Sequence, residues 1–251
     1  LFCEDPLRRR LAVQAITPEM GPRAADRVRA LLVTEKHPHV LASAVTTGAL
    51  LGVELMFLEP HLQNSDVRVR ANTVRAIGVL APPNLRVLLE PFMQDPEIRV
   101  QNEAIKGLSG FIPSSDLDRL IIRRFESEDQ RVRAATVILV GDLDLERRIP
   151  RLIKALQDPD RHVVGCAIRA LGKLPDPMAQ YALVDAYFSP PPQYSDSLQG
   201  KELLGTFPSD RILSVVDRLG TIVSIPDNSY SRLFDLIVLS PKWEPFLPWI
   251  L

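Results

Sequence analysis

The sequence has little cysteine, almost no net charge and no long apolar run. Its two cysteines, Cys3 and Cys166, cannot form a disulfide framework, which favours a reducing compartment. We therefore expect a cytoplasmic location. The net charge of −1 gives no bulk attraction to nucleic acid or to anionic membranes. No run of about eighteen residues is apolar throughout, so no segment is expected to span a bilayer. The chain begins with Leu1 rather than Met, which indicates an excerpt or a processed chain, so membrane association would come only through sequence outside it.

Aromatic residues are also scarce, at 6% of the chain against 46% for all apolar residues. A core must therefore be built from Leu, Val, Ile and Ala, which suits thin helical layers better than a β-sandwich. The 22 prolines outnumber the 12 glycines, and most prolines fall between apolar periodic stretches, where they end or begin helices. The composition thus favours an all-α fold.

One phrase recurs four times in the middle of the chain. The copies begin at residues 64, 95, 127 and 158 and read NSDVRVRANTVRAIGVL, DPEIRVQNEAIKGLSGF, SEDQRVRAATVILVGDL and DPDRHVVGCAIRALGKL. Successive copies lie 31, 32 and 31 residues apart. A fixed period of this length is typical of a solenoid, whose units bury their apolar faces only against neighbours. The repeat indicates a long binding surface and leaves the partner open.

The aligned copies predict one helix each. The third column is acidic and is expected to cap these helices at Asp66, Glu97, Asp129 and Asp160. At about 100° per residue, one sector of each helix is apolar. In the first copy this sector contains Val69, Thr73, Val74, Ile77 and Leu80, and in the second it ends at Phe111. Gly78, Gly141 and Gly172 recur near the helix ends, where small residues allow close helix approach. Second helices of similar length are expected between the copies, at Asn84–Gln94, Ser115–Glu126 and Leu145–Gln157.

The pattern resembles the HEAT repeat, and in particular its bacterial PBS lyase-like form. The resemblance rests on Asp158, Val163 and Ala170-Leu171-Gly172 in the fourth copy, and on Val69-Arg70 and Val132-Arg133 in the first and third. It implies an α-solenoid of about seven stacked antiparallel helix pairs. We expect residues 1–251 to form one such array, in which 64–174 match best while 1–63 and 175–251 hold degenerate or capping repeats.

Weaker elements extend the array in both directions. They are a leading helix at Pro6–Ile16, a pair at Pro22–Val33 and Val40–Gly48, a partial copy at Ser197–Phe207, and a last pair at Ser209–Gly220 and Asn228–Leu239. The tail Ser240–Leu251 carries tryptophans between prolines and is expected to cap the last repeat. The alternative is that these tryptophans lie at a membrane interface, with Arg8-Arg9-Arg10 as a cytoplasmic flank.

The resemblance also implies a ladder, in which the Arg of one repeat pairs with the turn Asp of the next. Arg70 would then pair with Asp95, and Arg133 with Asp158. Gln101 and Val164 occupy the Arg position in the second and fourth copies, so the ladder is expected to be broken at alternate steps.

Two columns point away from the apolar sector and form the candidate binding site. They contain Arg68, Arg99, Arg131 and His162, and Arg75, Lys106, Ile138 and Arg169. In the HEAT family this helix lines the concave side, so the resemblance implies a partly basic groove for an acidic peptide or protein surface. The alternative is a solvated face paired with acidic side chains of adjacent turns. Nucleic acid is disfavoured, because the basic face lacks aromatic residues. The expected groove residues are Arg68, Arg75, Arg99, Lys106, Arg131 and Arg169.

No motif predicts catalysis, a cofactor or a metal site. The chain has no phosphate-cradling glycine loop and no GxSxG or HExxH sequence. His37-Pro38-His39 lacks a third ligand, and Cys166 is expected to be a small packing residue. We therefore expect a protein-binding scaffold and no enzyme. The alternatives are a bilin lyase-like enzyme or chaperone of the same repeat type, or the cytoplasmic module of a larger membrane-associated protein.

Overall fold

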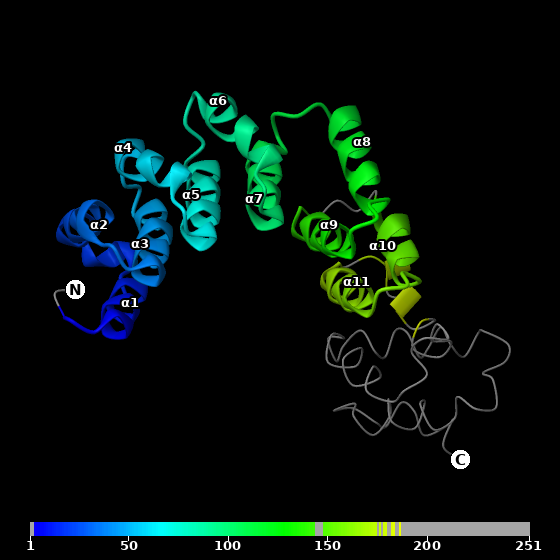
Figure 1. Ribbon diagram of the computed structural model, residues 1–251, viewed down its shortest axis with the longest axis horizontal. Helices are drawn as coiled ribbons and strands as arrows, with labels where there is room; N and C mark the ends of the chain where they lie inside the picture. The colour runs from blue at the N-terminus through cyan, green and yellow to red at the C-terminus, as the bar shows by residue number, and fades with distance from the viewer. Residues whose placement is uncertain are drawn as a thin grey trace, which may run out of the picture. The chain divides into compact units, whose positions relative to one another are not determined.

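The computed structural model describes residues 3–143 and 148–174, together with residues 176, 178, 179, 182, 183 and 186. Every regular element within these residues is a helix, so the expected all-α fold is confirmed (Figure 1). The elements expected at Ser197–Phe207, Ser209–Gly220, Asn228–Leu239 and Ser240–Leu251 lie outside the described residues. The count of about seven helix pairs therefore stays a prediction.

The chain divides into two compact units, Leu1–Arg124 and Phe125–Leu251. The first contains α1 (Pro6–Gln14), α2 (Pro22–Thr34), α3 (Pro38–Leu50), α4 (Leu55–Leu58), α5 (Val67–Leu80), α6 (Leu85–Leu89), α7 (Ile98–Leu108) and nearly all of α8 (Ser114–Phe125). The second contains α9 (Gln130–Asp142), α10 (Ile149–Ala155) and α11 (Arg161–Lys173). The expectation of one array over residues 1–251 stays a prediction.

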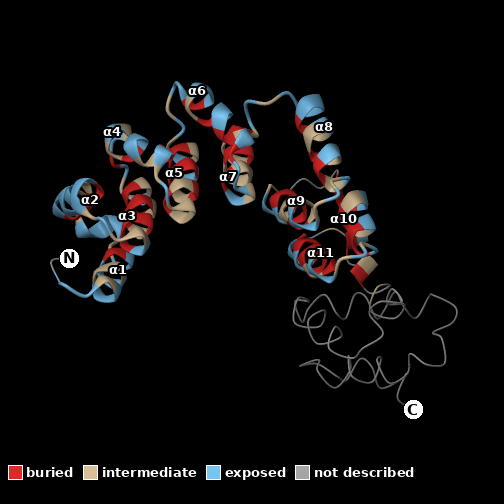
Figure 2. Cartoon of the chain, in the orientation of Figure 1, coloured by how far each residue is buried: buried red, intermediate tan, exposed pale blue. Residues whose placement is uncertain are grey.

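In the first unit, α1, α3, α5 and α7 form what we call the helix row. Each helix of the row packs against the next, and α2, α4 and α6 pack against the row along its left and upper edge in Figure 1. Val69, Val74 and Ile77 of α5 are fully buried, as are Val100 and Ala104 of α7. The predicted apolar sector therefore forms the core, and the opposite side of each row helix is more exposed (Figure 2).

The second unit repeats this packing. α9 packs against α11, and α10 packs against α11. Val137 and Val140 of α9 are buried, and so are Val163 and Leu171 of α11. The third and fourth copies of the phrase thus bury the same columns as the first two.

The acidic column caps three of the four central helices. The carboxylate of Asp66 accepts hydrogen bonds from two amides in the first turn of α5, and Asp160 does the same in α11, whereas Asp129 accepts from one amide of α9. Glu97 makes no such bond at the start of α7. Its side chain is longer by one methylene, and the shorter Asp is the preferred cap. The prediction of a cap at Glu97 is therefore wrong.

The second helix of a repeat can be much shorter than the first, so the prediction of similar lengths is wrong for Asn84–Gln94. There, α6 has 5 residues and continues as a 3-10 turn over Glu90–Gln94, whereas α5 has 14 residues. Pro91 explains the break, because it has no N–H to donate to the preceding turn and its ring crowds that turn. Pro60 does the same after α4. No proline interrupts α8, which runs for 12 residues.

Phe111 lies outside the core, although its column predicts burial. α7 ends at Leu108, which is buried, and Phe111 follows in the turn with 54% of its surface exposed. The helical period no longer sets the direction of a side chain once the helix has ended.

Glycines allow neighbouring helices of the phrase to approach closely. A Cβ atom on Gly141 of α9 would lie 2.9 Å from the Cβ of Ala170 on α11. Unbonded carbon atoms prefer separations of about 3.5–4.0 Å, so any side chain here would push the two helices apart. Gly78 and Gly107 meet between α5 and α7, where a Cβ on Gly78 would lie 3.1 Å from the Cα of Gly107.

The same Gly→Ala change is expected to have opposite effects at two positions of the second unit. Gly141→Ala should lower the free energy of unfolding by about 1–3 kcal/mol, because the added methyl overpacks the α9–α11 contact. Gly165→Ala on α11 is the control: its Cβ would meet nothing closer than 3.6 Å, and its better helix propensity should add up to about 1 kcal/mol. Urea unfolding measures the free energy of unfolding of both variants. If the two variants changed it equally, the close approach of α9 and α11 at Gly141 would be contradicted.

Candidate functional site

Two buried ion pairs join successive repeats at the positions that the family resemblance implies. In the first, Arg70 donates from Nε to Oδ2 of Asp95 and from Nη2 to Oδ1, each over 3.1 Å. Its Nη1 donates to the carbonyls of Asn64 and Ser65, over 2.8 and 3.3 Å. The side chains of the pair are only 13% and 7% exposed. One arginine therefore joins the turn before its own helix to the turn of the next repeat.

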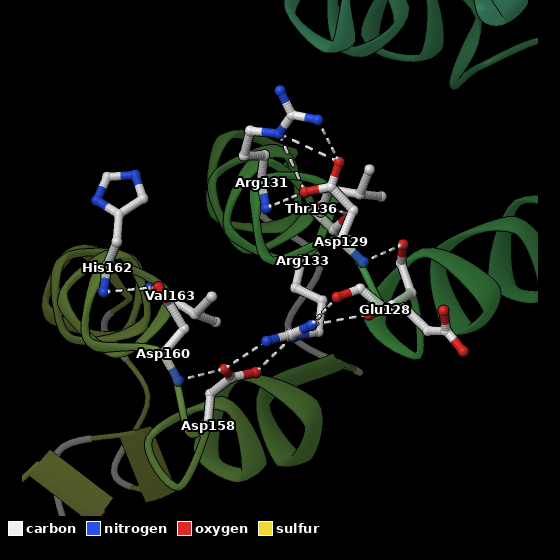
Figure 3. A network of polar contacts seen from close by, with 11 residues as sticks. Glu128, Asp129, Arg131, Arg133, Thr136, Asp158, Asp160, His162 and Val163 are labelled. Atoms are coloured by element: carbon white, nitrogen blue, oxygen red, sulfur yellow. Dashed lines mark hydrogen bonds and ion pairs between the residues drawn. The ribbon is translucent and has the colours of Figure 1, made fainter. Parts of the chain in front are cut away.

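Arg133 repeats this arrangement in the second unit (Figure 3). It donates to both carboxylate oxygens of Asp158 over 2.8 and 3.0 Å, and its Nη1 donates to the carbonyls of Ser127 and Glu128. In Figure 3 its guanidinium lies between the two turns, with Asp158 on one side and Glu128 on the other.

A third pair of this kind, Arg9 with Glu35, escaped the sequence analysis. Arg9 donates to both carboxylate oxygens of Glu35 over 2.8 and 3.1 Å, and its Nη1 donates to the carbonyls of Cys3 and Glu4. The signal was present, because Arg9 is the fourth residue after the cap Asp5, just as Arg70 follows Asp66. We call these three pairs the ion-pair ladder.

In each repeat, the residue two positions before the helix cap, which we call the turn residue, makes the same hydrogen bond. This residue is acidic in every second repeat. Its side chain accepts a hydrogen bond from the amide two residues later, at Glu35, Asn64, Asp95, Ser127 and Asp158. The fourth residue after the cap is, in order, Arg9, Leu41, Arg70, Gln101 and Arg133. Arginine is therefore present where the following turn residue is acidic, and it is absent where that residue is Asn64 or Ser127.

At the Gln101 step an uncharged contact replaces the ion pair. Gln101 donates to the carbonyl of Asp95 over 2.7 Å, which is the bond that Nη1 of the ladder arginines makes. Its side-chain oxygen accepts from Arg124 over 2.7 Å, and Arg124 also donates to Asn102. Burial lowers the pKa of Arg124. The repeat contact is thus retained without a carboxylate.

Two of the six expected groove residues fold back onto their own helix caps. Arg68 donates to both oxygens of Asp66, with Nη2 and Oδ2 2.6 Å apart, and Arg131 donates to Asp129 over 2.8 Å. The hydrogen bonds from Arg68 lower the pKa of Asp66 to about 2. The solvated, acid-paired alternative therefore describes the geometry at these two positions.

The other expected groove residues have different surroundings. Arg75 donates to Thr46 over 3.3 Å, Arg99 donates to Asn72 over 3.2 Å, and Arg169 donates to the sulfur of Cys166 over 3.2 Å. Lys106 lies 3.7 Å from Glu103. Among the residues that the structure describes, Arg75 and Arg99 contact no carboxylate.

A groove of about 370 Å³ lies on the exposed side of the helix row, in the first unit. It is lined by Arg10, Gln14, His39, Ala42, Ser43, Thr46, Thr47, Leu50, Arg68, Asn72, Arg75 and Arg99. Four arginines and a histidine thus share this groove, and no Asp or Glu is among the lining residues. The structure brings Arg68, Arg75 and Arg99 together here, whereas Arg131 and Arg169 belong to the second unit.

Arg10 and His39 are groove residues that the sequence analysis missed. The run Arg8-Arg9-Arg10 separates into three environments: Arg8 lies 3.7 Å from Asp5 on the surface, Arg9 belongs to the ladder, and Arg10 lines the groove. His39 is 29 residues before Arg68, the same interval that aligns Val40–Gly48 with the phrase, so the spacing could have placed it in the Arg68 column. The pKa of His39 is lowered, first by the charge of Arg68 and then by burial.

Comparison with known proteins agrees with this architecture. Residues 117–196 match the family of HEAT repeats. HEAT repeats are therefore present in this part of the chain. The fold of the chain is similar to that of the complex of CpcE and CpcF of phycocyanin lyase from Nostoc sp. PCC7120, at 18% sequence identity and a TM-score of 0.51, covering 94% of this chain and 90% of that one. An engineered protein also matches, at 19% identity and a TM-score of 0.36, over 80% of this chain and 94% of that one. No curated protein matches the chain.

The remaining candidates for chemistry have structural surroundings. Cys166 is buried on its HEAT helix, and burial raises the pKa of its thiol, which keeps it protonated and poorly nucleophilic at neutral pH. The rings of His37 and His39 lie 5.7 Å apart. Within the described part of the chain, no three His, Cys, Asp or Glu side chains gather where they could hold a metal ion. No helix in that part is long and apolar enough to cross a membrane.

Loss of a ladder arginine is expected to cost far more than loss of its surface neighbour. Arg133→Met should lower the free energy of unfolding by up to about 3 kcal/mol, because it leaves the carboxylate of Asp158, only 11% exposed, unpaired. Arg131→Met, on the same helix, removes a side chain that is 78% exposed and should cost less than about 1 kcal/mol. Chemical denaturation of both variants checks this. Equal losses would mean that the ladder does not hold the repeats together.

The cap Asp66 is expected to make stability fall in acid. Because its pKa is lowered to about 2 from the ordinary 3.8 of an aspartate, its contribution is complete above pH 3.8 and is lost as pH falls towards 2. Asp66→Asn keeps a good capping side chain but loses the charge. This variant should therefore lose stability less steeply than the wild type between these pH values, as measured by thermal unfolding across the range. Parallel pH profiles would contradict the assignment.

Proposed function

We propose that this HEAT-repeat protein is a non-catalytic scaffold that binds an acidic peptide or protein surface in the groove of the helix row. The feature that supports this best is the composition of the groove, which combines Arg10, Arg68, Arg75 and Arg99 with no acidic lining residue. Arginine forms bidentate hydrogen bonds with carboxylates, so such a surface is suited to a partner that carries Asp or Glu.

The solvated alternative accounts for only part of the basic surface. It fits Arg68 and Arg131, whose charges are already balanced by Asp66 and Asp129. It does not account for Arg75 and Arg99, whose hydrogen-bond partners among the described residues are neutral. A guanidinium has five N–H donors, and each of these two arginines uses one of them in the contacts described. The rest are available to a partner.

Two observations favour a protein partner over nucleic acid. No Phe, Tyr or Trp is among the residues that line the groove, so bases would find no stacking surface there. The chain as a whole carries a net charge of −1, which gives no long-range attraction to a polyanion. A positively charged groove on a chain of nearly zero net charge is suited to bind a short acidic segment of a protein partner.

The remaining expected groove residues would extend this surface. Lys106 follows Arg75 in the same column and is the next position along the helix row, although Glu103 partly balances its charge. Arg131 and Arg169 would give the second unit its own acid-binding positions. Arg169 is the stronger candidate of the two, because Arg131 is held by Asp129.

The likeness to a phycocyanin lyase complex suggests a second candidate function, that of a lyase subunit or of a chaperone for a bilin-carrying protein. The likeness extends over 94% of this chain, which supports the proposal at the level of fold. Co-expression with a bilin and an acceptor protein tests it directly. Visible absorbance that co-purifies with the chain would favour this function, and a colourless product would count against it.

Charge reversal in the groove is expected to abolish partner capture without unfolding the protein. Arg75→Glu with Arg99→Glu places two carboxylates in the groove, where they should repel an acidic partner. The control, Arg86→Glu with Arg119→Glu, makes the same change of charge at two exposed residues outside the groove lining. Affinity purification of the full-length protein with quantitative mass spectrometry compares the two variants with the wild type.

The outcome depends on which partners are lost. Partners retained by the wild type and the control variant but lost from the groove variant would support the proposal, provided that these partners carry acidic segments. Unchanged capture by the groove variant would overturn it. Circular dichroism and thermal unfolding establish that both variants remain folded.

A further inference from the structure

Arg75 and Arg99 are held in place by a chain of neutral side chains. Arg99 donates to the side-chain oxygen of Asn72, and the amide nitrogen of Asn72 donates to Thr46 over 3.2 Å. The hydroxyl of Thr46 also accepts from Arg75. Asn72 is itself fixed by a bond of 2.9 Å to the carbonyl of Ala42 on α3. Two guanidinium groups from different helices are thus positioned beforehand, which lowers the entropy lost when they bind a ligand.

The basic side chains are distributed along the helix row and do not converge on one point. Arg10 lies on α1, His39 on α3, Arg68 and Arg75 on α5, and Arg99 on α7. Neighbouring packed helices lie about 8–10 Å apart, so the charges extend over roughly 25 Å across the row. A single phosphate or carboxylate group cannot reach all of them. An extended ligand can.

The spacing of the row matches the repeat of an extended peptide. A polyproline II segment is extended, rises about 3.1 Å per residue and has three residues per turn, so three residues cover the distance from one row helix to the next. Every third side chain of such a segment points to the same side, and each would lie over a new helix of the row. The groove is also lined by Gln14, Ser43 and Thr46, which can bond to the unpaired backbone of such a segment.

We infer that the groove binds an extended acidic segment of a protein partner, which crosses the helix row in a polyproline II conformation and places a carboxylate at about every third residue over a new helix. This inference rests on the proposed function and adds the conformation and the charge spacing of the segment. Arg75 and Arg99 form the best-defined pair of positions, and Arg10 lies towards the opposite end.

His39 supplies an independent readout. Its ring contacts Nη1 of Arg68 through Nε2 at 2.6 Å and Nδ1 at 3.2 Å; a guanidinium N–H can only donate, so the ring nitrogen accepts and the contact favours the neutral ring. The charged groups that act on His39 are Arg10 from α1, His37 from its own turn, and Arg68 with Asp66 from α5. A bound carboxylate would offset the positive charges and favour protonation of the ring. The segment should therefore bind more tightly at about pH 6 than at about pH 8.

Synthetic peptides of equal composition test the spacing. One peptide carries glutamate at every third position, separated by serine and glycine, and its isomer carries the same glutamates in one block. Fluorescence anisotropy with the full chain should show the spaced peptide binding about tenfold more tightly than the block isomer. Arg75→Glu with Arg99→Glu should abolish this preference, whereas Arg86→Glu with Arg119→Glu should retain it. His39→Gln keeps a hydrogen-bond acceptor but cannot gain a proton, and it should remove the pH dependence.

The outcomes separate the two proposals. Equal binding of the two isomers, together with loss of both in the groove variant, would overturn the extended segment but leave an acid-binding groove. No binding of either peptide, or binding that the groove variant retains, would overturn the groove itself. A preference for a singly phosphorylated peptide without other acids would overturn the distributed arrangement in favour of a compact anion site.

Discussion

A carboxylate that serves two purposes at once determines how successive repeats pack. Asp95 accepts the amide of Glu97, which fixes the turn, and it binds the guanidinium of Arg70, which belongs to the preceding helix. The same arginine holds the carbonyls of the turn before its own helix. Each charged step therefore ties a helix, and the turn just before it, to the turn of the next repeat, 25 or 26 residues further along the chain. Because the side chains of Arg70 and Asp95 are 13% and 7% exposed, loss of either partner leaves a largely buried charge unpaired.

The groove is the other side of the same arrangement. In α1 the ladder residue Arg9 faces the turns, and its neighbour Arg10 lines the groove on the exposed side of the row. The close helix contacts at Gly78 and Gly107 keep α5 and α7 together, and this sets the separation of Arg75 and Arg99. A binding surface made of long, flexible side chains thereby gains a rigid base.

The repeated phrase predicted the all-α fold and the caps at Asp66, Asp129 and Asp160, and the family resemblance implied the two ladder pairs of the central repeats. The phrase could not predict which arginine side chains fold back onto the cap of their own helix. Arg68 folds onto Asp66, and no column of a sequence alignment shows that rotamer. The short α6 could have been foreseen from Pro91, since proline lacks the N–H that a continuing helix needs. Arg10 was hidden because the first repeat is degenerate, so its position depends on recognising Asp5 as the cap of α1.

The alternation of charged and uncharged steps makes two repeats, not one, the modular unit of this chain. Arg9, Arg70 and Arg133 meet an acidic turn residue, whereas Leu41 and Gln101 precede the neutral turn residues Asn64 and Ser127. If one repeat were deleted, Arg70 would be followed by Ser127 and would lose its counter-ion. If two were deleted, Arg70 would be followed by Asp158, and the pairing would be restored. An array of this kind can be shortened or lengthened in steps of two repeats without disturbing its internal charge balance, which constrains both its evolution by duplication and any attempt to redesign its length.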